Sequence, residues 1–510
     1  MPAPRTGPRP RPSAAARPEP APRSDTGPRP FSEARPGDGP RGGPRAARET
    51  ERGSERRPAP GFAPRSGPAD RQPPTEAFDT TVLHYFAACP RGLEAALAAE
   101  LRALGAHVDA SPAGGALFRG DRALGYAVNL HSRIASRVLL RVSTARYRGD
   151  DDLYRMAHRI GWERWFGVEH TLRIDVNAIR APVHSLNFVT LRIKDGVVDR
   201  FRDRTGARPS IDTTRPRVRI FGFLEEDHAT LYLDLSGEPL FKRGWRSQRD
   251  DKGEAPLKEN LAAGLLALSG WTPDQPLYDP FCGSGTIVIE AAQQACGIAP
   301  GARRGFAFED LNDFDAATWT RLRDAAADAE RRGLSALQDA PLQIAASDID
   351  PRAVEQLQRN AERAGLPAGL IPARCIDIRD ADPPFATPGL IVANPPYGER
   401  IDLRGAHIDA RDERFDAHGE RPDPGDEPVA GGGESRRPAG PGDADDAWPT
   451  IGRHLRQAFP GWKVWLLSSD PHLPRRLLLK ERRKTPLFNG AIECRLFGFE
   501  LFARRPEGTG

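Results

Sequence analysis

The pattern of apolar and polar positions predicts ordered structure from about Thr81 and divides the ordered chain into two regions. Up to residue 240, short strands are mixed with helical segments that repeat apolar residues every three or four positions. From Leu257 onward, short apolar strands alternate with helices, which is typical of a parallel sheet with helical crossovers. The pattern therefore predicts an α+β region at 81–240 and a doubly wound, Rossmann-like α/β domain at 241–505.

Each region has its own expected elements. In the first, we expect strands at 82–88, 116–119, 136–142, 171–176, 217–221 and 229–235, and helices at 93–104, 124–130, 151–160 and 185–202. In the second, we expect strands at 277–280, 342–347, 373–376, 390–393 and 464–468. The segment 486–502 carries Asn489-Gly490 between two strand-like runs, which predicts a C-terminal β-hairpin.

Composition sets two further segments apart. Residues 1–80 are dominated by Arg, Pro, Gly and Ala, and residues 402–446 by acidic residues, Gly and Pro. Such compositions cannot bury enough apolar surface to offset chain entropy, so we expect a disordered basic tail and a disordered acidic insertion. The tail could bind a polyanion, or it could be a solubilising tail or reflect coding bias. The insertion could gate a site or be a tolerated surface loop.

The cysteines and the hydropathy of the chain bear on its cellular compartment and on whether it has a metal site, disulfides or a membrane span. The five cysteines are scattered without a Cys-x-x-Cys pair, which argues against a structural zinc site or a disulfide framework and fits a reducing cytosol. No run approaches the roughly 18 apolar residues of a membrane span. We therefore expect a cytoplasmic protein with no metal and no membrane partner.

Two short motifs carry the candidate chemistry. Asp279-Pro-Phe-Cys-Gly-Ser-Gly-Thr286 follows an apolar strand, and its glycines allow the backbone to approach a ligand closely. Asp348 and Asp377 end or follow two further strands, so three acids are expected at one edge of the sheet, where nucleotide-like ligands bind. An aspartate at a strand end can also be a helix cap, and Asp350, which precedes Pro351, fits that role better.

The second motif is Asn394-Pro-Pro-Tyr397, which follows another apolar strand. This motif would suit a ligand that presents an exocyclic amine, whose nitrogen lone pair is delocalised into the ring. The Asn394 side-chain oxygen and the Pro395 carbonyl could accept N–H bonds and so orient that lone pair for attack. Pro396 stiffens the turn, and Tyr397 could stack on a base turned out of its helix. The alternative is an ordinary proline-rich turn.

Together the two motifs resemble the cofactor and catalytic loops of class I S-adenosylmethionine-dependent amino-methyltransferases. The resemblance implies S-adenosyl-L-methionine (SAM) as cofactor and a domain that ends in an antiparallel hairpin. It implies cofactor binding by Asp279, Phe281, Gly283, Gly285, Thr286, Asp348 and Asp377, and catalysis by Asn394, Pro395, Pro396 and Tyr397. The motif Asn-Pro-Pro-Tyr alone leaves adenine in DNA, guanine in RNA and glutamine in proteins as possible acceptors.

Further stretches resemble the N-terminal half of the bacterial RlmL family. They are Leu240-Phe-Lys-Arg-Gly-Trp-Arg246, Ala255-Pro-Leu-Lys-Glu-Asn-Leu-Ala262 and Asn394-Pro-Pro-Tyr-Gly-Glu-Arg400. The resemblance implies a ferredoxin-like domain and an RNA-binding THUMP module before residue 240. It also implies N2-methylation of a guanine in 23S ribosomal RNA, either naked or in a pre-ribosomal particle. Lys258, Glu259 and Asn260 would line the approach to the cofactor, or simply begin a capped helix.

The expected helix at 185–202 is rich in basic residues that could meet RNA phosphates. These residues are Arg192, Lys194, Arg200 and Arg202. Acidic residues alternate with them, so the same pattern also fits a solvated helix with internal ion pairs. Three alternatives to the 23S ribosomal RNA reading stay open: a transfer RNA guanine-N2 methyltransferase, a DNA adenine-N6 or protein glutamine methyltransferase, and a non-catalytic RNA-binding factor.

Overall fold

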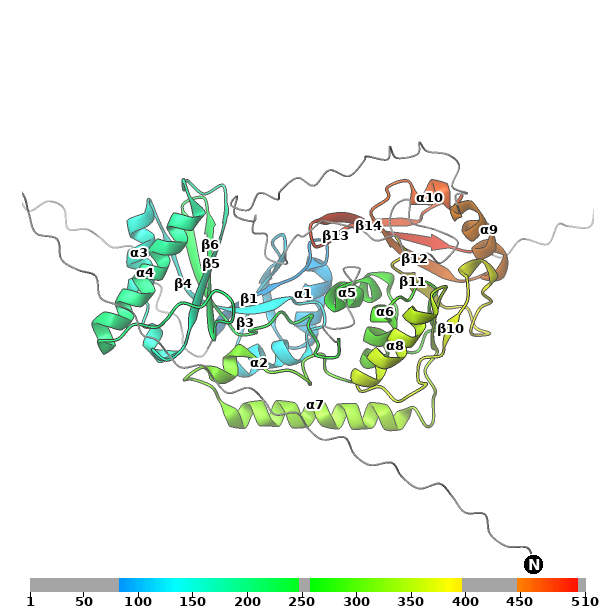
Figure 1. The fold of residues 1–510 in the computed structure, drawn as a ribbon, viewed down its shortest axis with the longest axis horizontal. Helices are drawn as coiled ribbons and strands as arrows, with labels where there is room; N and C mark the ends of the chain where they lie inside the picture. Colours follow the sequence, from blue (N-terminus) through cyan, green and yellow to red (C-terminus); the bar gives the residue numbers. More distant parts are fainter. Residues whose placement is uncertain (1–81, 247–256, 397–446, 503–510) are drawn as a thin grey trace, which may run out of the picture. The chain divides into compact units, whose positions relative to one another are not determined.

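The computed structural model describes residues 82–246, 257–396 and 447–502. The predicted tail at 1–80, the predicted insertion at 402–446 and Tyr397 lie outside the described residues. Within the described ranges the fold is carried by two seven-stranded sheets, each joined to its own helices (Figure 1).

The first sheet occupies the first region of the chain. Its strands are β1 Leu83–Ala88, β2 His107–Ala110, β3 Gly115–Gly120, β4 Arg137–Arg146, β5 Leu172–Ile179, β6 Val218–Glu225 and β7 His228–Asp234. They lie in the order β2-β3-β1-β4-β7-β6-β5, and all neighbours are antiparallel except β5 and β6. The ten-residue strand β4 pairs with β1 on one side and β7 on the other, so a single sheet runs through the whole region.

Four α-helices accompany this sheet. They are α1 Glu94–Ala103, α2 Arg122–His131, α3 Asp150–Arg159 and α4 Leu186–Thr205, and a short 3-10 helix, η1, spans Trp162–Arg164. Helices α3 and α4 lie side by side along the sheet (Figure 1). Buried residues recur every fourth position of α4, at Val189, Ile193, Val197 and Phe201. This apolar stripe faces the core, which leaves the charged positions of α4 on the opposite side.

The second sheet is largely parallel, as predicted. Its strands are β8 Leu277–Asp279, β9 Ile344–Asp348, β10 Ala373–Cys375, β11 Leu390–Ala393, β12 Lys463–Ser468, β13 Arg483–Asn489 and β14 Ile492–Glu500. They lie in the order β10-β9-β8-β11-β12-β14-β13. Strands β10 to β12 in this order run parallel, whereas β14 is antiparallel to both β12 and β13. The predicted fold class, a doubly wound domain that ends in a hairpin, is confirmed.

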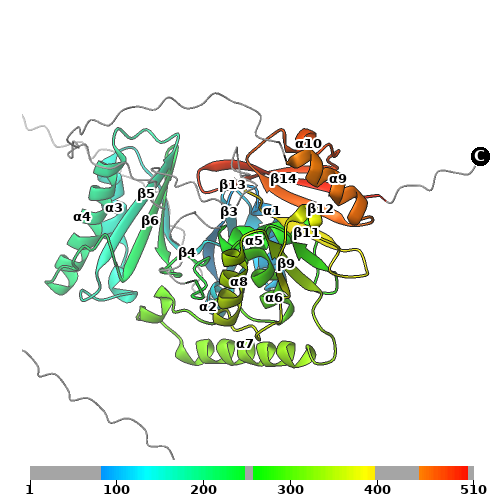
Figure 2. The ribbon, with the colours of Figure 1, turned by 45° about the vertical axis from the view of Figure 1, so that its right-hand side comes forward.

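Helices cover both faces of this sheet. They are α5 Glu259–Ser269, α6 Thr286–Ala295, α8 Pro351–Arg363, α9 Trp448–Ala458 and α10 Leu473–Arg476, with the 3-10 turn η3 Ile378–Asp380. Helix α7 Ala316–Ala336 and the 3-10 turn η2 Ala307–Asp310 instead pack against the first region, where α7 lies beside α2. Leu390 and Val392 join the core formed with α5, α6 and α8, while Ile391 and Ala393 join the core formed with α9 and α10. Figure 2 shows these two sets of helices on either side of β11 and β12. Both faces of β11 are therefore buried, which explains its uninterrupted apolar sequence.

Two elements are absent from the sequence-based prediction. The edge strand β2 is short and largely exposed. Helix α7 is 21 residues long, but only Trp319 and Ala326 in it are buried. A strand or helix that buries so little of its surface carries a weak apolar pattern, so periodicity could not find either one.

Candidate functional site

Four polar residues of the parallel sheet follow its strands at the carboxyl ends. Asp279 and Asp348 are the last residues of β8 and β9, Asp377 lies two residues beyond β10, and Asn394 directly follows β11. Strands β10, β9, β8 and β11 are parallel neighbours in that order. The four residues therefore come to one edge of the sheet, which is where doubly wound folds bind nucleotide-like ligands.

The loop between β8 and α6 is shaped for close approach of a ligand. Gly285 precedes α6 in the left-handed conformation, with φ +87°. A Cβ added there would lie 2.6 Å from Leu357 Cγ of α8, so only glycine fits. At Gly283 a Cβ would meet no atom within 4 Å, which marks open space above the loop. Its amide donates to Asp348 Oδ2 at 2.8 Å and so fixes the loop against the end of β9.

The electrostatics of this edge favour a ligand that carries positive charge. Asp279 is only 1% exposed, and burial raises its pKa to about 8, with a further rise from the negative Asp348 and an opposing effect of the Phe281 amide. Burial also raises the pKa of Asp348, although backbone amides of Gly283 and Asp350 oppose the rise. No cation of the described chain is among the groups that set the pKa of Asp279. A cationic ligand group would restore its charge.

Asp377 already has a partner in the structure. Its carboxylate accepts two bonds from the Arg379 guanidinium, at 3.0 and 2.6 Å, and one from the Arg379 amide at 2.9 Å. Burial alone would raise the pKa of Asp377, but these bonds with Arg379 outweigh it and lower the pKa overall. Asp377 thus begins the short helix η3. A ligand amine would have to share the carboxylate with Arg379.

The residues after β11 continue the same edge. Asn394 is half-buried, Pro395 is buried and Pro396 is exposed. Strand β11 lies between β8 and β12, so Asn394 follows a strand next to the one that ends in Asp279.

Asp350 accepts a bond from the Arg352 amide at 2.9 Å and begins α8, with Pro351 in the first turn. Its predicted role as a helix cap is confirmed.

Two apolar residues at this edge escape sequence analysis. Ile349 follows Asp348 directly and is 51% exposed, so an apolar side chain beside the acid is open to a ligand. Trp448 begins α9, and its ring lies 6.3 Å from that of Phe281 in the glycine loop. Ile349 could have been noticed as an apolar residue just beyond a strand end. Trp448 is 167 residues beyond Phe281 in the chain, so no local pattern connects the two.

Arg246 links the start of α5 with the start of α6. Its guanidinium donates to the Leu257 carbonyl at 2.9 Å and to Thr286 Oγ1 at 2.5 Å, and its Nε lies 3.0 Å from Glu259 Oε1. Burial raises the pKa of Glu259 to about 7, even though the Arg246 charge opposes this rise. Asn260 donates to Ser136 Oγ at 2.9 Å, in the first region of the chain. Through Arg246, Glu259 therefore connects the start of α5 to the start of α6, whereas Asn260 connects α5 to the first region.

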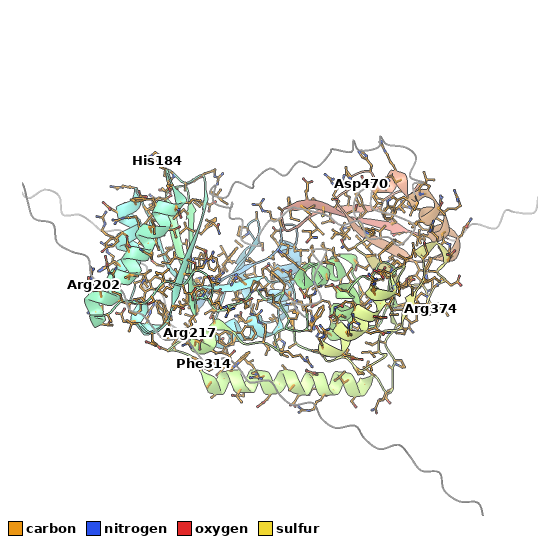
Figure 3. The ribbon with its side chains drawn as sticks, viewed as in Figure 1. His184, Arg202, Arg217, Phe314, Arg374 and Asp470 are labelled. Carbon is orange, nitrogen blue, oxygen red and sulfur yellow. The ribbon has the colours of Figure 1, made fainter. Side chains whose placement is uncertain are left out.

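The four basic residues singled out on α4 all lie in ion pairs with acidic residues. The pairs are Arg192 with Asp151, Lys194 with Asp195, Arg200 with Glu163 and Arg202 with Asp199. Arg202 lies near the C-terminal end of α4 (Figure 3). Arg192 also lies over the Tyr154 ring of α3, 4.8 Å from its centroid. Most of the positive charge of α4 is thus balanced within this part of the chain.

The described ranges contain neither a candidate metal site nor a candidate membrane span. In the ranges 82–246, 257–396 and 447–502, no three His, Cys, Asp or Glu side chains come together in a way that could hold a metal ion. None of the helices described is long and apolar enough to cross a membrane.

Three family models match consecutive parts of the chain. The RlmL ferredoxin-like domain matches residues 84–139, the THUMP domain matches 147–234, and the RMKL-like methyltransferase domain matches 246–412. These matches follow the division of the structure into an α+β region and a doubly wound domain.

Individual proteins are similar over most of the chain. "Putative RNA methyltransferase slr0064" of Synechocystis sp. is 36% identical over 84% of this chain and 100% of its own length. Ribosomal RNA large subunit methyltransferase K/L of Aeromonas salmonicida is 35% identical over 82% of this chain and 54% of its own length, so the chain spans about half of that relative. The crystal structure of SMU.472, "a putative methyltransferase complexed with SAH", superimposes with a TM-score of 0.65 at 27% identity, over 83% of this chain and 99% of that one.

Proposed function

Because the chain belongs to the family of RMKL-like RNA methyltransferases with a THUMP domain, we propose that it methylates the exocyclic N2 amine of a guanine in 23S ribosomal RNA. SAM is the methyl donor of this family. The observation that carries the proposal is the position of Asn394-Pro395-Pro396 directly after β11, next to the strand that ends in Asp279. The name of the ribosomal relative favours this substrate, either naked or in a pre-ribosomal particle.

In the proposed reaction, Asn394 and Pro395 hold the amine. The Asn394 side-chain oxygen and the Pro395 carbonyl each accept one N–H, which turns the nitrogen lone pair toward the methyl group. Pro396 limits the movement of that carbonyl, and Tyr397 stacks on the extruded base. The amine becomes strongly acidic only after it has been methylated, so no strong base is needed before transfer. Positioning and dipole orientation therefore provide most of the rate enhancement.

The proposed cofactor contacts use the acids of the same edge. Asp279 faces the cationic methionine end, whose positive charge would offset the effect of burial that raises the pKa of this carboxyl. Asp348 accepts hydrogen bonds from the ribose hydroxyls. Asp377 accepts a hydrogen bond from the adenine amine while its carboxylate remains bonded to Arg379. Ile349 adds apolar contact for the adenine ring. The remaining contacts come from the loop between β8 and α6, through Phe281, Gly283, Gly285 and Thr286.

The reaction is tested with purified protein, labelled SAM and undermodified total RNA, followed by nuclease digestion and mass spectrometry. We expect label in N2-methylguanine of 23S ribosomal RNA. Replacing Asn394 by Ala removes one of the two acceptors, so we expect kcat to fall by about 100-fold or more while the Kd for SAM changes little. Asn177→Ala, which removes an exposed asparagine from β5, is the matched control and should retain kcat.

Each other outcome points to a different conclusion. Label on transfer RNA would keep the chemistry and replace the substrate. An absence of RNA label together with SAM binding would overturn the proposal, and DNA adenine and protein glutamine would then be the acceptors to examine. Unchanged activity in Asn394→Ala would show that another residue positions the amine.

A further inference from the structure

A cavity of about 440 Å³ lies apart from the glycine loop. Three segments distant in sequence form it: the turn with Arg91, the start of α5 with Lys258 and Asn260, and the tip of the β13–β14 hairpin with Phe488, joined by Phe241. Its volume falls within the range of about 300–1,000 Å³ that is typical of ligand pockets. None of the described residues that line it belongs to the loop 281–286 or to the segment 394–396. The cavity is therefore distinct from the proposed methyl-transfer site.

The cavity nevertheless lies toward the same edge of the sheet as Asn394. Ser468, the last residue of β12, pairs with Arg495 of β14, and β14 begins earlier, at Ile492. The tip of the hairpin therefore extends beyond the carboxyl end of β12. Strand β12 runs parallel to β11, which leads directly into Asn394. A polymer bound at the candidate active site could thus reach the cavity without crossing the sheet.

The chemistry of the wall suits a nucleotide. The Arg91 guanidinium lies over the Phe488 ring at 5.9 Å from its centroid, and Lys258 Nζ lies over the Phe241 ring at 5.0 Å. Aromatic side chains provide stacking surfaces for bases, and neighbouring cations attract phosphates. Neither Arg91 nor Lys258 forms an ion pair with an acidic residue in the described ranges, in contrast to the basic residues of α4.

One buried polar atom at the wall lacks a partner. Asn260 is 0% exposed, and its Nδ2 donates to Ser136 Oγ at 2.9 Å and to the Ile134 carbonyl at 3.3 Å. Its Oδ1 is buried without a hydrogen bond among the described residues. A buried acceptor left unpaired costs on the order of 1–3 kcal/mol, and the two bonds donated by Nδ2 hold the side chain in this position at the cavity wall.

The wall segments are held firmly against one another. A Cβ added to Gly92, beside Arg91, would lie 2.3 Å from the Pro486 carbonyl oxygen of β13. The turn and the hairpin are therefore in direct backbone contact. Such contact fixes the spacing between Arg91 and Phe488 before any ligand binds, which lowers the entropic cost of binding.

We propose that this cavity binds a second nucleotide of the RNA substrate, at the same edge of the sheet as the nucleotide that is methylated. Its base rests on the rings of Phe488 and Phe241, and Arg91 and Lys258 meet the adjoining phosphates. This inference rests on the proposed function, because it assigns a second subsite for the same RNA. Through Arg91, the region before residue 240 then contacts the RNA directly and helps to position it.

The test measures KM and kcat for undermodified ribosomal RNA, together with the Kd for RNA by filter binding. Stacking on an aromatic side chain contributes about 1–3 kcal/mol per base, so Phe488→Ala should raise the Kd and KM about 5- to 160-fold. At saturating RNA, kcat should stay near the wild-type value, and Phe488→Trp should restore the affinity. The matched control is Phe502→Ala, because Arg482 lies over the exposed Phe502 ring at 5.4 Å outside the cavity.

Arg91→Ala tests the phosphate contact separately, and ultraviolet crosslinking tests whether RNA lies beside Phe488. Arg91→Ala changes an exposed side chain and should reduce the salt dependence of RNA binding by about one phosphate contact. Ultraviolet crosslinking of the wild-type complex should join RNA to the peptide that contains Phe488. Variants that match Phe502→Ala, with no such crosslink, would overturn the cavity proposal while wild-type methylation of RNA still supported the function. Failure of the wild type to bind or methylate any RNA would overturn both.

Discussion

Charged side chains occur in two contrasting settings in this chain, at the junction of the two regions and on α4. At the junction, Arg243 and Arg133 lie 3.0 and 3.4 Å from the carboxylate of Glu290 in α6, and Arg243 is only 2% exposed. On α4, the Arg200 side chain lies 2.5 Å from Glu163, and both remain partly exposed. Both settings combine arginine with glutamate, so residue type alone does not distinguish them. The difference lies in the amount of water that each pair excludes.

The pKa of a carboxyl shifts in opposite directions in the two settings. Burial raises the pKa of Glu259 to about 7, despite the neighbouring Arg246. For Glu163, the hydrogen bond from Arg200 lowers the pKa. The buried carboxyl of Glu259 is thus more easily protonated in the folded chain, whereas the partly exposed carboxyl of Glu163 is held ionised. Each buried carboxyl therefore stabilises the fold only while its arginine partner remains in place.

The largest expected effect comes from removing Glu290. Glu290→Ala leaves the buried guanidinium of Arg243, and that of Arg133, without a counter-charge. Breaking a buried ion pair in this way costs about 3–5 kcal/mol in the free energy of unfolding. Glu163→Ala, the matched change at the α4 surface, should cost only about 0.2–1 kcal/mol. Urea unfolding monitored by tryptophan fluorescence measures both. Equal losses would show that the contrast in burial has no energetic consequence.

The next effect is a pH dependence of opposite sign at the two sites. The pKa of Glu259 is higher in the folded chain than its ordinary value of 4.5, so the folded chain binds this proton more tightly and stability falls as the pH rises from about 4.5 to about 7. Glu259→Gln should remove this fall, which amounts to about 1–3 kcal/mol. Midpoints of urea unfolding across this pH range measure it.

The matched variant at the surface is Glu163→Gln. Because the pKa of Glu163 is lowered in the folded chain, its carboxylate adds stability above its ordinary pKa and loses this effect as the pH falls below it. The variant should therefore lower stability at neutral pH by no more than about 1 kcal/mol and remove this decline in acid, and it should leave the change in stability between pH 4.5 and 7 as in the wild type. If Glu259→Gln retained the wild-type fall in stability toward neutral pH, burial of Glu259 would not be its cause.

The parts of the fold that the sequence predicts are those that depend on residues close together in the chain. Strands such as β11 and the hairpin around Asn489-Gly490 follow from local signals, because both faces of β11 are buried and the turn residues are specific. The cap at Asp350 follows from the adjacent Pro351. These features depend on neighbouring residues alone. Periodicity and turn chemistry therefore suffice for most of the architecture.

Features made by distant segments could not be predicted in this way. Helix α7 buries Trp319 against Tyr126 and Phe308, whose rings stack at 4.3 Å across 182 positions of the chain. The cavity at Phe488 likewise combines segments from both ends of the described chain. The acids at the strand ends were predicted because parallel topology brings them to one edge. For α4 the sequence gives the charges, and only the fold reveals that they are paired.

The smallest expected effect concerns Arg202, the most exposed of the four basic residues on α4. Its ion pair with Asp199 at 3.2 Å should contribute no more than about 1 kcal/mol to stability. If α4 nevertheless meets RNA phosphates, Arg202→Ala should reduce the slope of log Kd against log salt by about 0.7–0.9, which corresponds to one lost phosphate contact. Arg155→Ala, on the neighbouring α3, removes an arginine that is similarly exposed and paired with Asp152, and should leave the slope unchanged. Equal slopes in both variants would reduce α4 to a solvated helix with internal pairs and leave Arg91 and Lys258 as the cations that meet the RNA.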